Sequence, residues 1–244
     1  MWYENNASSD KTYNGTGDDG LKNIRIAIDG PSGAGKSTLA KRIAKELGII
    51  YLDTGAMYRA VALKAIRLGI DTRDREKVSR LMDDIDISVD YQDGTQRIYL
   101  DGEDVSSAIR TNEVSMGASN VSAFPEVREK LVALQQEIAR NNSVVMDGRD
   151  IGTKVLPDAG LKIFLTASPE ERARRRYEEL KEKGILDKTF EELVAEIQER
   201  DRNDSTRKYS PLKKADDAVE IDSTGKSVDE ITAVIMDMVR ERFG

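Results

Sequence analysis

Hydrophobic residues follow two alternating patterns along this chain of 244 residues. Short apolar runs typical of buried strands occur at NIRIAID (23–29), IIYLD (49–53), SVVMD (143–147), LKIFL (161–165) and AVEID (218–222). Between them, apolar residues recur every three or four positions, as Leu39, Ile43, Ala44 and Leu47 do in a helix expected from Ser37. Strands that alternate with helices predict a parallel sheet with helices on both faces.

Residues suited to helix ends mark several boundaries. Gly48 and Gly69 fit the ends of helices that start near Ser37 and Gly55, and another helix is expected near 126–140. Three pairs have the spacing of a capping box: Ser168 with Glu171, Thr189 with Glu192, and Ser227 with Glu230. The helix after Ser227 should bury a stripe of Ile231, Val234, Ile235 and Met238.

Residues 85–101 depart from this pattern. IDISVD alternates strictly between apolar and polar residues, QDGT supplies a turn, and RIYLD follows. This order predicts a β-ribbon inserted into the alternation of strands and helices. At the other extreme, residues 1–22 are polar and without periodicity, so we expect a disordered tail before a single domain that spans 23–244.

Composition narrows the class of protein. The chain is 39% hydrophobic and 34% charged, has no cysteine, and shows neither a signal peptide nor an apolar run near the roughly 20 residues that span a bilayer. Its net charge of −7 argues against a general nucleic-acid binder. We therefore expect a cytoplasmic protein that acts on neither membranes nor nucleic acid.

The segment DGPSGAGKST contains a phosphate-binding loop. Gly30, Gly35, Lys36 and Ser37 fit the pattern G-x-x-x-x-G-K-[ST] between a strand and a helix. Backbone N–H groups and the helix N-terminus would surround the phosphates, the lysine would contact β/γ oxygens, and the hydroxyl can ligate Mg²⁺. The expected ATP-binding residues are Gly30, Pro31, Ser32, Gly33, Ala34, Gly35, Lys36, Ser37 and Thr38.

A second Gly-Lys-Ser, at 225–227, is interpreted differently. Glu220 stands where that pattern needs its first glycine, and its carboxylate would repel phosphate. We expect an ordinary helix start there. The chain also lacks the Asn-Lys-x-Asp element with which a switch GTPase reads guanine, TKVL at 153–156 being the nearest approach.

Arginines and the absence of histidine indicate where the phosphoryl group goes. Arginines occur on predicted loops and helices at 59, 128, 149, 172, 174, 175, 176, 200, 202 and 207. A single arginine is usually a solvated surface charge, but this many could neutralise two phosphorylated ligands in one site. An acceptor phosphate oxygen is already anionic, so transfer to it needs no histidine as general base. The pattern favours a nucleotide kinase without identifying the base.

Five segments, in order, resemble bacterial cytidylate kinases: DGPSGAGKST, YLDTGAMYR, GRDIGT, the arginine-rich helix and DSTRKYSPL. The resemblance covers about residues 23–243. It implies an α/β fold of the P-loop type in three layers, and transfer of phosphate from MgATP to CMP and dCMP by a monomer. It divides the domain into a core (23–53, 123–169 and 212–244), an inserted monophosphate-binding region with a small β-ribbon (54–122), and a helical lid (170–211).

The resemblance also implies residue roles. The CMP-binding positions would be Thr54, Tyr58, Arg59, Ser119, Arg128, Arg149, Asp150, Asp204 and Arg207. The catalytic cations would be Lys36, Arg149, Arg174 and Arg200. Ser37 and, through water, Asp53 would hold Mg²⁺, although capping of the next helix is an alternative role for Asp53. The family usually has serine in place of Thr54 and often arginine in place of Asn203.

Two other functions remain open from the residues alone. A non-catalytic protein that binds ATP would not need an arginine pocket for a second nucleotide. A kinase of the same fold could instead use another acceptor, such as UMP.

Overall fold

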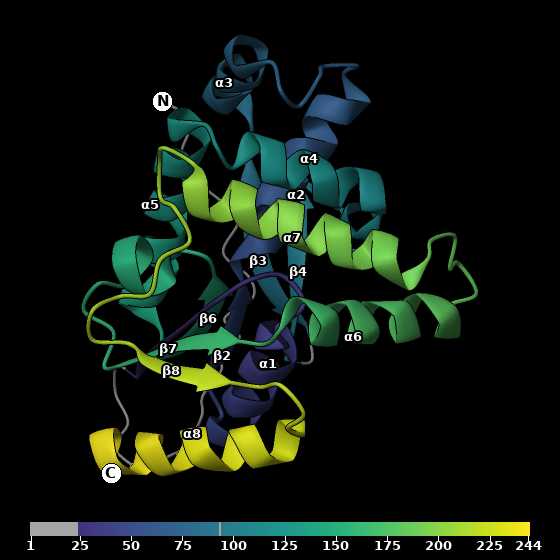
Figure 1. The fold of residues 1–244 in the computed structure, drawn as a ribbon. Coiled ribbons are helices and arrows are strands. Elements are labelled where there is room, and N and C mark those ends of the chain that lie inside the picture. The colour runs from purple at the N-terminus through teal and green to yellow at the C-terminus, as the bar shows by residue number, and fades with distance from the viewer. Residues whose placement is uncertain (1–23, 93) are drawn as a thin grey trace, which may run out of the picture.

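The computed structural model describes residues 24–92 and 94–244 (Figure 1). The predicted disordered tail, 1–22, lies outside the described residues, as does Asp93 of the predicted QDGT turn.

The core is a sheet of five parallel strands, and all five were predicted. They are β1 (Arg25–Asp29), β2 (Ile50–Asp53), β6 (Val144–Gly148), β7 (Leu161–Thr166) and β8 (Val219–Asp222). Their order is β2-β6-β1-β7-β8. The strand that leads into the phosphate-binding loop is therefore central, and ligand sites are expected at the carboxyl ends of such strands.

Helices cover both faces of this sheet, which confirms the predicted α/β fold. One apolar cluster joins the sheet to α1 (Lys36–Leu47) and α8 (Val228–Phe243). The larger cluster joins the other face to α2 (Thr54–Arg67) and α5 (Pro125–Asn141). Among the described residues, no helix is long and apolar enough to cross a membrane.

The apolar stripe predicted on α8 is wrong in one position. Val234 is 47% exposed, whereas Ile231, Ile235 and Val239 are buried. These three residues are spaced four apart, and that spacing keeps them on the face that packs against α1. Val234 precedes Ile235 by 100° of helix rotation and faces solvent.

The ribbon in the inserted region is confirmed and has a third strand. β3 (Ile87–Gln92) pairs antiparallel with β4 (Thr95–Leu100), and β4 pairs with the short β5 (Glu103–Asp104). Around it lie α3 (Arg75–Asp84), a 3-10 turn (Ala108–Arg110) and α4 (Asn112–Val121), none of which was predicted. The polar sequence of α4 hides its helical period, but Gly117 lets it approach Ala62 of α2 closely.

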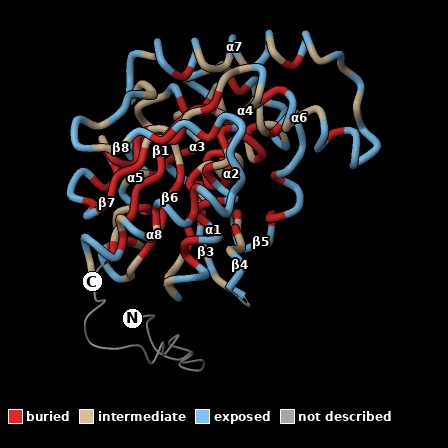
Figure 2. The backbone as a smooth tube through the Cα atoms, turned by 60° about the horizontal axis from the view of Figure 1, so that its bottom comes forward, coloured by how far each residue is buried: buried red, intermediate tan, exposed pale blue. Residues whose placement is uncertain are grey.

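The last unit is a hairpin of α6 (Pro169–Glu182) and α7 (Phe190–Thr206), which lies beside the carboxyl ends of the strands (Figures 1 and 2). It has a small apolar cluster of its own, which includes Ala173, Leu180 and Leu193. Capping boxes start α7 and α8 as predicted. The box predicted before α6 is only half formed: Ser168 accepts from the N–H of Glu171, but its own N–H donates to Thr224.

Candidate active site

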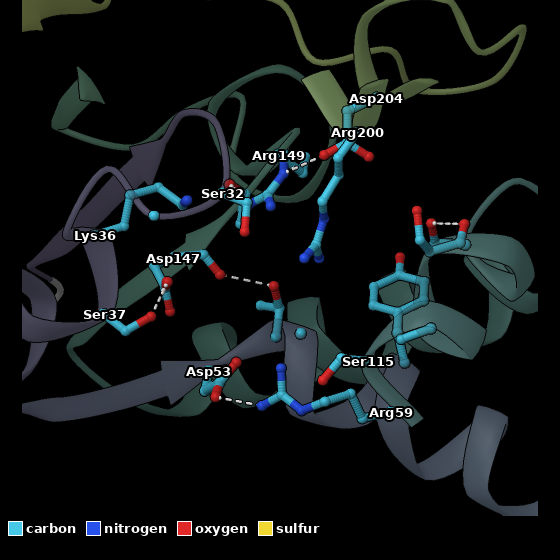
Figure 3. A pocket seen from close by; sticks show the side chains of 18 of the residues that line it. Ser32, Lys36, Ser37, Asp53, Arg59, Ser115, Asp147, Arg149, Arg200 and Asp204 are labelled. Carbon is cyan, nitrogen blue, oxygen red and sulfur yellow. Dashed lines mark hydrogen bonds and ion pairs between the residues drawn. The ribbon is translucent and has the colours of Figure 1, made fainter. Parts of the chain in front are cut away.

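A cavity of about 560 Å³ opens at the carboxyl ends of β1, β2 and β6 (Figure 3). The phosphate-binding loop, α2, α4, α5 and the α6–α7 hairpin all contribute to its wall. Nine basic and five acidic side chains line it. A chain whose net charge is −7 thus gathers positive charge in one place, which suits anionic ligands.

The phosphate-binding loop forms one end of the cavity. Gly33 and Gly35 have φ of 77° and 92°, and a Cβ at Gly30 would lie 2.0 Å from the Leu165 carbonyl oxygen, so this path requires glycine. Lys36 Nζ donates to the Pro31 carbonyl at 2.7 Å. Burial, and then the nearby Arg149, lower the pKa of Lys36 to about 7. Pro31 and Ala34 contribute carbonyl groups to the loop but do not line the cavity.

Asp147, at the end of β6, is a site residue that the sequence analysis missed. Its carboxylate accepts from Ser37 Oγ at 2.8 Å and from the Tyr51 hydroxyl at 2.8 Å. Burial, and then the charge of Asp53, raise its pKa. An aspartate at the carboxyl end of a buried strand next to the phosphate-loop strand was the available signal.

Asp53 has the alternative role that was predicted for it. One carboxylate oxygen caps α2 by accepting from the Ala56 N–H at 3.0 Å, and the other pairs with Arg59 Nη2 at 2.8 Å. The carboxylate still lines the cavity, on the same side as Asp147 and Ser37 (Figure 3).

All nine residues predicted to bind CMP line the same cavity, opposite the phosphate-binding loop: Thr54, Tyr58, Arg59, Ser119, Arg128, Arg149, Asp150, Asp204 and Arg207. Arg128 is buried, forms an ion pair with Asp150, and lies 5.3 Å from the centre of the Tyr58 ring. Within the described chain, the buried Tyr58 hydroxyl has no hydrogen-bond partner. Ser115 and Ser122 also line this end and were not predicted.

The GRDIGT segment lies against the end of β1. The Asp29 carboxylate accepts from the backbone N–H groups of Ile151 and Gly152 at 2.8 and 2.7 Å. Burial raises the pKa of Asp29 to about 6. These bonds fix the loop that carries Arg149 and Asp150 to the strand that carries the phosphate-binding loop.

Arg149 and Arg200 lie side by side near Asp204 and extend into the cavity (Figure 3). Arg149 Nε donates to Asp204 at 2.7 Å. Arg200 is half-buried, and its buried Nε has no partner among the described residues. Burial, and then the adjacent Arg149, lower the pKa of Arg200 to about 10.

Arg174, predicted as a catalytic cation, does not line the cavity. Its side chain is 53% exposed and pairs with Glu171 and Glu178 along the outer face of α6. The rotation of α6 instead directs Arg172, Arg175 and Arg176 toward the cavity. The sequence could not decide this, because four arginines within five residues leave the inward face ambiguous.

Comparisons with known proteins agree on one family. A sequence model of the cytidylate kinase family matches residues 26–241. A cytidylate kinase from Caldicellulosiruptor bescii is 54% identical over 89% of this chain and 96% of its own length. A cytidylate kinase from Streptococcus gordonii is 51% identical over 91% of this chain and 98% of its own. A solved structure of an uncharacterized protein from Eubacterium ventriosum shares the fold alone, with a TM-score of 0.51 at 15% identity over 91% of this chain and 100% of its own.

Proposed function

The chain belongs to the cytidylate kinase family, and from that premise we propose how its cavity divides between two nucleotides. The enzyme is a nucleoside monophosphate kinase that phosphorylates CMP and dCMP with ATP. One observation carries the proposal: a phosphate-binding loop and a cluster of buried and half-buried arginines face each other across a single cavity. ATP occupies the loop end, and the monophosphate occupies the end with Arg59, Arg128 and Arg207.

At the ATP end, the α1 N-terminus and Lys36 hold the phosphates. Kinases of this kind use a divalent metal with ATP, and we propose Mg²⁺. The donor set fits, since the Ser37 hydroxyl lies 2.8 Å from an Asp147 carboxylate oxygen, and Asp53 lies close enough to raise the Asp147 pKa. Ser37 and Asp147, with Asp53 through water, would hold the ion, which supplies charge neutralisation between the phosphates when bound.

At the acceptor end, Arg59, Arg149 and Arg207 hold the monophosphate, and Ser119 with Arg128 reads the acceptors of cytosine. Asp150 and Asp204 both line this end and could accept from the pentose hydroxyls. Catalysis then consists of alignment and charge neutralisation by Lys36, Arg149 and Arg200. No protein base is required, because the attacking phosphate oxygen is already anionic.

The α6–α7 hairpin acts as the lid (170–211) over the core, and 54–122 is the monophosphate-binding insert. Closure would exclude water, which otherwise competes as acceptor. We further propose that the enzyme works as a cytoplasmic monomer on free nucleotides, since its family resemblance and acidic charge favour small-molecule substrates.

A coupled assay of ATP consumption with CMP, dCMP, UMP, AMP and GMP tests this function. We expect turnover with CMP and dCMP far above that with purine monophosphates. ATP binding without CDP formation would support the non-catalytic alternative, and a preference for UMP would change the acceptor.

A further inference from the structure

The inserted ribbon contacts the sheet at the exposed edge of β2. β2 is the first strand of the sheet order and pairs only with β6 within the described sheet. The Ile50 N–H donates toward β6 at Ser143, so by the alternation of a strand the backbone groups of Tyr51 and Asp53 face outward. Unpaired groups at such an edge need partners.

Two side chains of the ribbon provide them. Gln96 of β4 accepts from the Asp53 N–H through Oε1 at 2.7 Å and donates to the Asp53 carbonyl through Nε2 at 3.3 Å. The Tyr91 hydroxyl of β3 donates to the Tyr51 carbonyl at 3.2 Å. The Gln96 amide thus takes the place of a neighbouring strand at the last residue of β2.

Asp53, the last residue of β2, forms an ion pair with Arg59, which lines the cavity. The Asp53 carboxylate caps α2 and pairs with Arg59 Nη2 at 2.8 Å. The pair lies over Gly55, where a Cβ would come within 3.2 Å of both Arg59 Nη1 and Asp53 Oδ1. With so little space, a small rotation of the Asp53 backbone moves its carboxylate and therefore the Arg59 guanidinium.

We propose that Gln96 is a positioning residue, which fixes Asp53 and through it directs Arg59 at the acceptor phosphate without touching either substrate. The inference rests on the proposed role of Arg59. It gives the ribbon a function in acceptor affinity, although Gln96 does not line the cavity. The amide is specific to this task, since it supplies an acceptor and a donor to the two backbone groups of one residue.

The test compares Gln96→Leu with Gln92→Leu. Gln92 lies on the neighbouring strand of the same ribbon, is exposed, and its amide bonds only weakly, at 3.4 Å, to Tyr99. We expect Gln96→Leu to raise the KM for CMP at least fivefold, with kcat and the KM for ATP within twofold of the starting values. Gln92→Leu should leave all three unchanged.

A double variant with Arg59→Ala shows whether Gln96 acts through Arg59 or whether its replacement disturbs the site in general. In an Arg59→Ala background, Gln96→Leu should add less than a twofold change in the KM for CMP, because the residue that it directs is gone. Equal effects in both backgrounds overturn the proposal, as does an unchanged KM for CMP in the single variant. If Gln96→Leu does not fold, Gln96→Met, which keeps the length of the side chain and loses both the acceptor and the donor without adding a charge, should raise the same constant by a similar factor. Wild-type enzyme without CMP kinase activity would refute the proposed function instead.

Discussion

At the residue scale, Arg149 shows why a planar guanidinium differs from a point charge. Its Nε donates to Asp204 at 2.7 Å and Nη1 donates to the Gly148 carbonyl at 3.3 Å. Both bonds fix the plane of the group and leave other N–H groups for a phosphate between the two nucleotide sites. A lysine ammonium carries the charge but cannot hold this orientation.

Arg149→Lys should therefore lower kcat by about tenfold or more, which corresponds to about 1.4 kcal/mol of transition-state stabilisation. Steady-state kinetics with CMP and ATP measure it. Arg140→Lys is the matched control, because Arg140 is exposed in the last turn of α5. Wild-type turnover in Arg149→Lys would remove this residue from the catalytic machinery.

Gln135 is a buried polar residue whose side-chain oxygen lacks a hydrogen-bond donor within the described residues. Its side chain is fully buried on α5, its amide nitrogen lies 3.7 Å from Met57 sulfur, and its Oε1 has no partner in the described part of the chain. An unsatisfied buried acceptor costs about 1–3 kcal/mol. Gln135→Leu should raise the midpoint of thermal unfolding by a few degrees, at about 2–4 °C per kcal/mol for a chain of this size.

For the adjacent Gln136, the same substitution by leucine should lower the midpoint of thermal unfolding. Gln136 donates to the carbonyls of Lys154 and Val155 at 3.3 and 3.2 Å, so Gln136→Leu should lower the unfolding midpoint. Thermal melts of both variants decide the matter. A lower midpoint for Gln135→Leu would mean that Oε1 has a partner, such as a buried water.

Single residues also mark what the sequence could and could not predict. The sequence could place the residues proposed for the acceptor site in one group because segments such as GRDIGT and DSTRKYSPL resemble those of a known family, and these residues do line one cavity. Arg174 was not, because its direction depends on how α6 packs against α7. Asp147 was missed because one aspartate at a strand end carries no motif of its own.

At the scale of elements, Arg172 joins three parts of the molecule. Its buried guanidinium donates to the Ala167 carbonyl before α6 at 2.9 Å and to the Ser32 carbonyl in the phosphate-binding loop at 3.0 Å. It also forms a two-pronged pair with Asp201 of α7, at 3.0 and 2.5 Å. Asp201 adjoins Arg200, so α7 and the phosphate-binding loop share one anchor.

Asp201→Asn should loosen this anchor. We expect it to lower kcat and the yield of CDP per ATP consumed more than it lowers affinity for the substrates. Arg200 would be held less firmly and the lid would exclude water less well, so kcat should fall about tenfold and fewer CDP molecules should form per ATP consumed. Parallel measurement of ATP loss and CDP gain gives the ratio. Glu199→Gln, at an exposed position of the same helix, is the control. An unchanged ratio with unchanged kcat would show that the pair has no such role.

The strands of the sheet and the helices that cover it were predicted from the sequence, whereas α3 and α4 were not. The five strands and the helices beside them were readable because their apolar residues face the two large clusters on either side of the sheet. The elements α3 and α4 lie in the region proposed as the insert, where α4 packs closely on α2 through small residues such as Gly117 against Ala62. The α3 sequence does carry a helical pattern that was overlooked, with Asp74 as N-cap and Val78 and Met82 buried one turn apart. In α4, Ser, Asn and Gly residues interrupt the apolar positions, so its packing against α2 determines the helix.

At the scale of the whole molecule, an acidic body encloses a basic cavity. This separation concentrates positive potential in the cavity where we propose that two anionic nucleotides meet. It also places Lys36 among several arginines before any ligand is bound. Burial, and then Arg149, favour the neutral form of Lys36 and hold its pKa near about 7, against an ordinary value of 10.5. The empty enzyme therefore carries less charge at this lysine than the nucleotide complex requires.

ATP binding at pH 8 should consequently take up protons. In the free enzyme Lys36 is mostly neutral at pH 8, because that pH lies above its lowered pKa of about 7. The phosphates of bound ATP favour the charged ammonium, so they should raise the pKa of Lys36 above 8. Calorimetric titration with a non-hydrolysable ATP analogue, in two buffers of different ionisation enthalpy, should give up to about one proton per site. CMP alone, bound away from Lys36 and fully ionised at pH 8, is the control and should give almost none. Equal binding enthalpies in both buffers with the ATP analogue would show that Lys36 is already charged in the free enzyme.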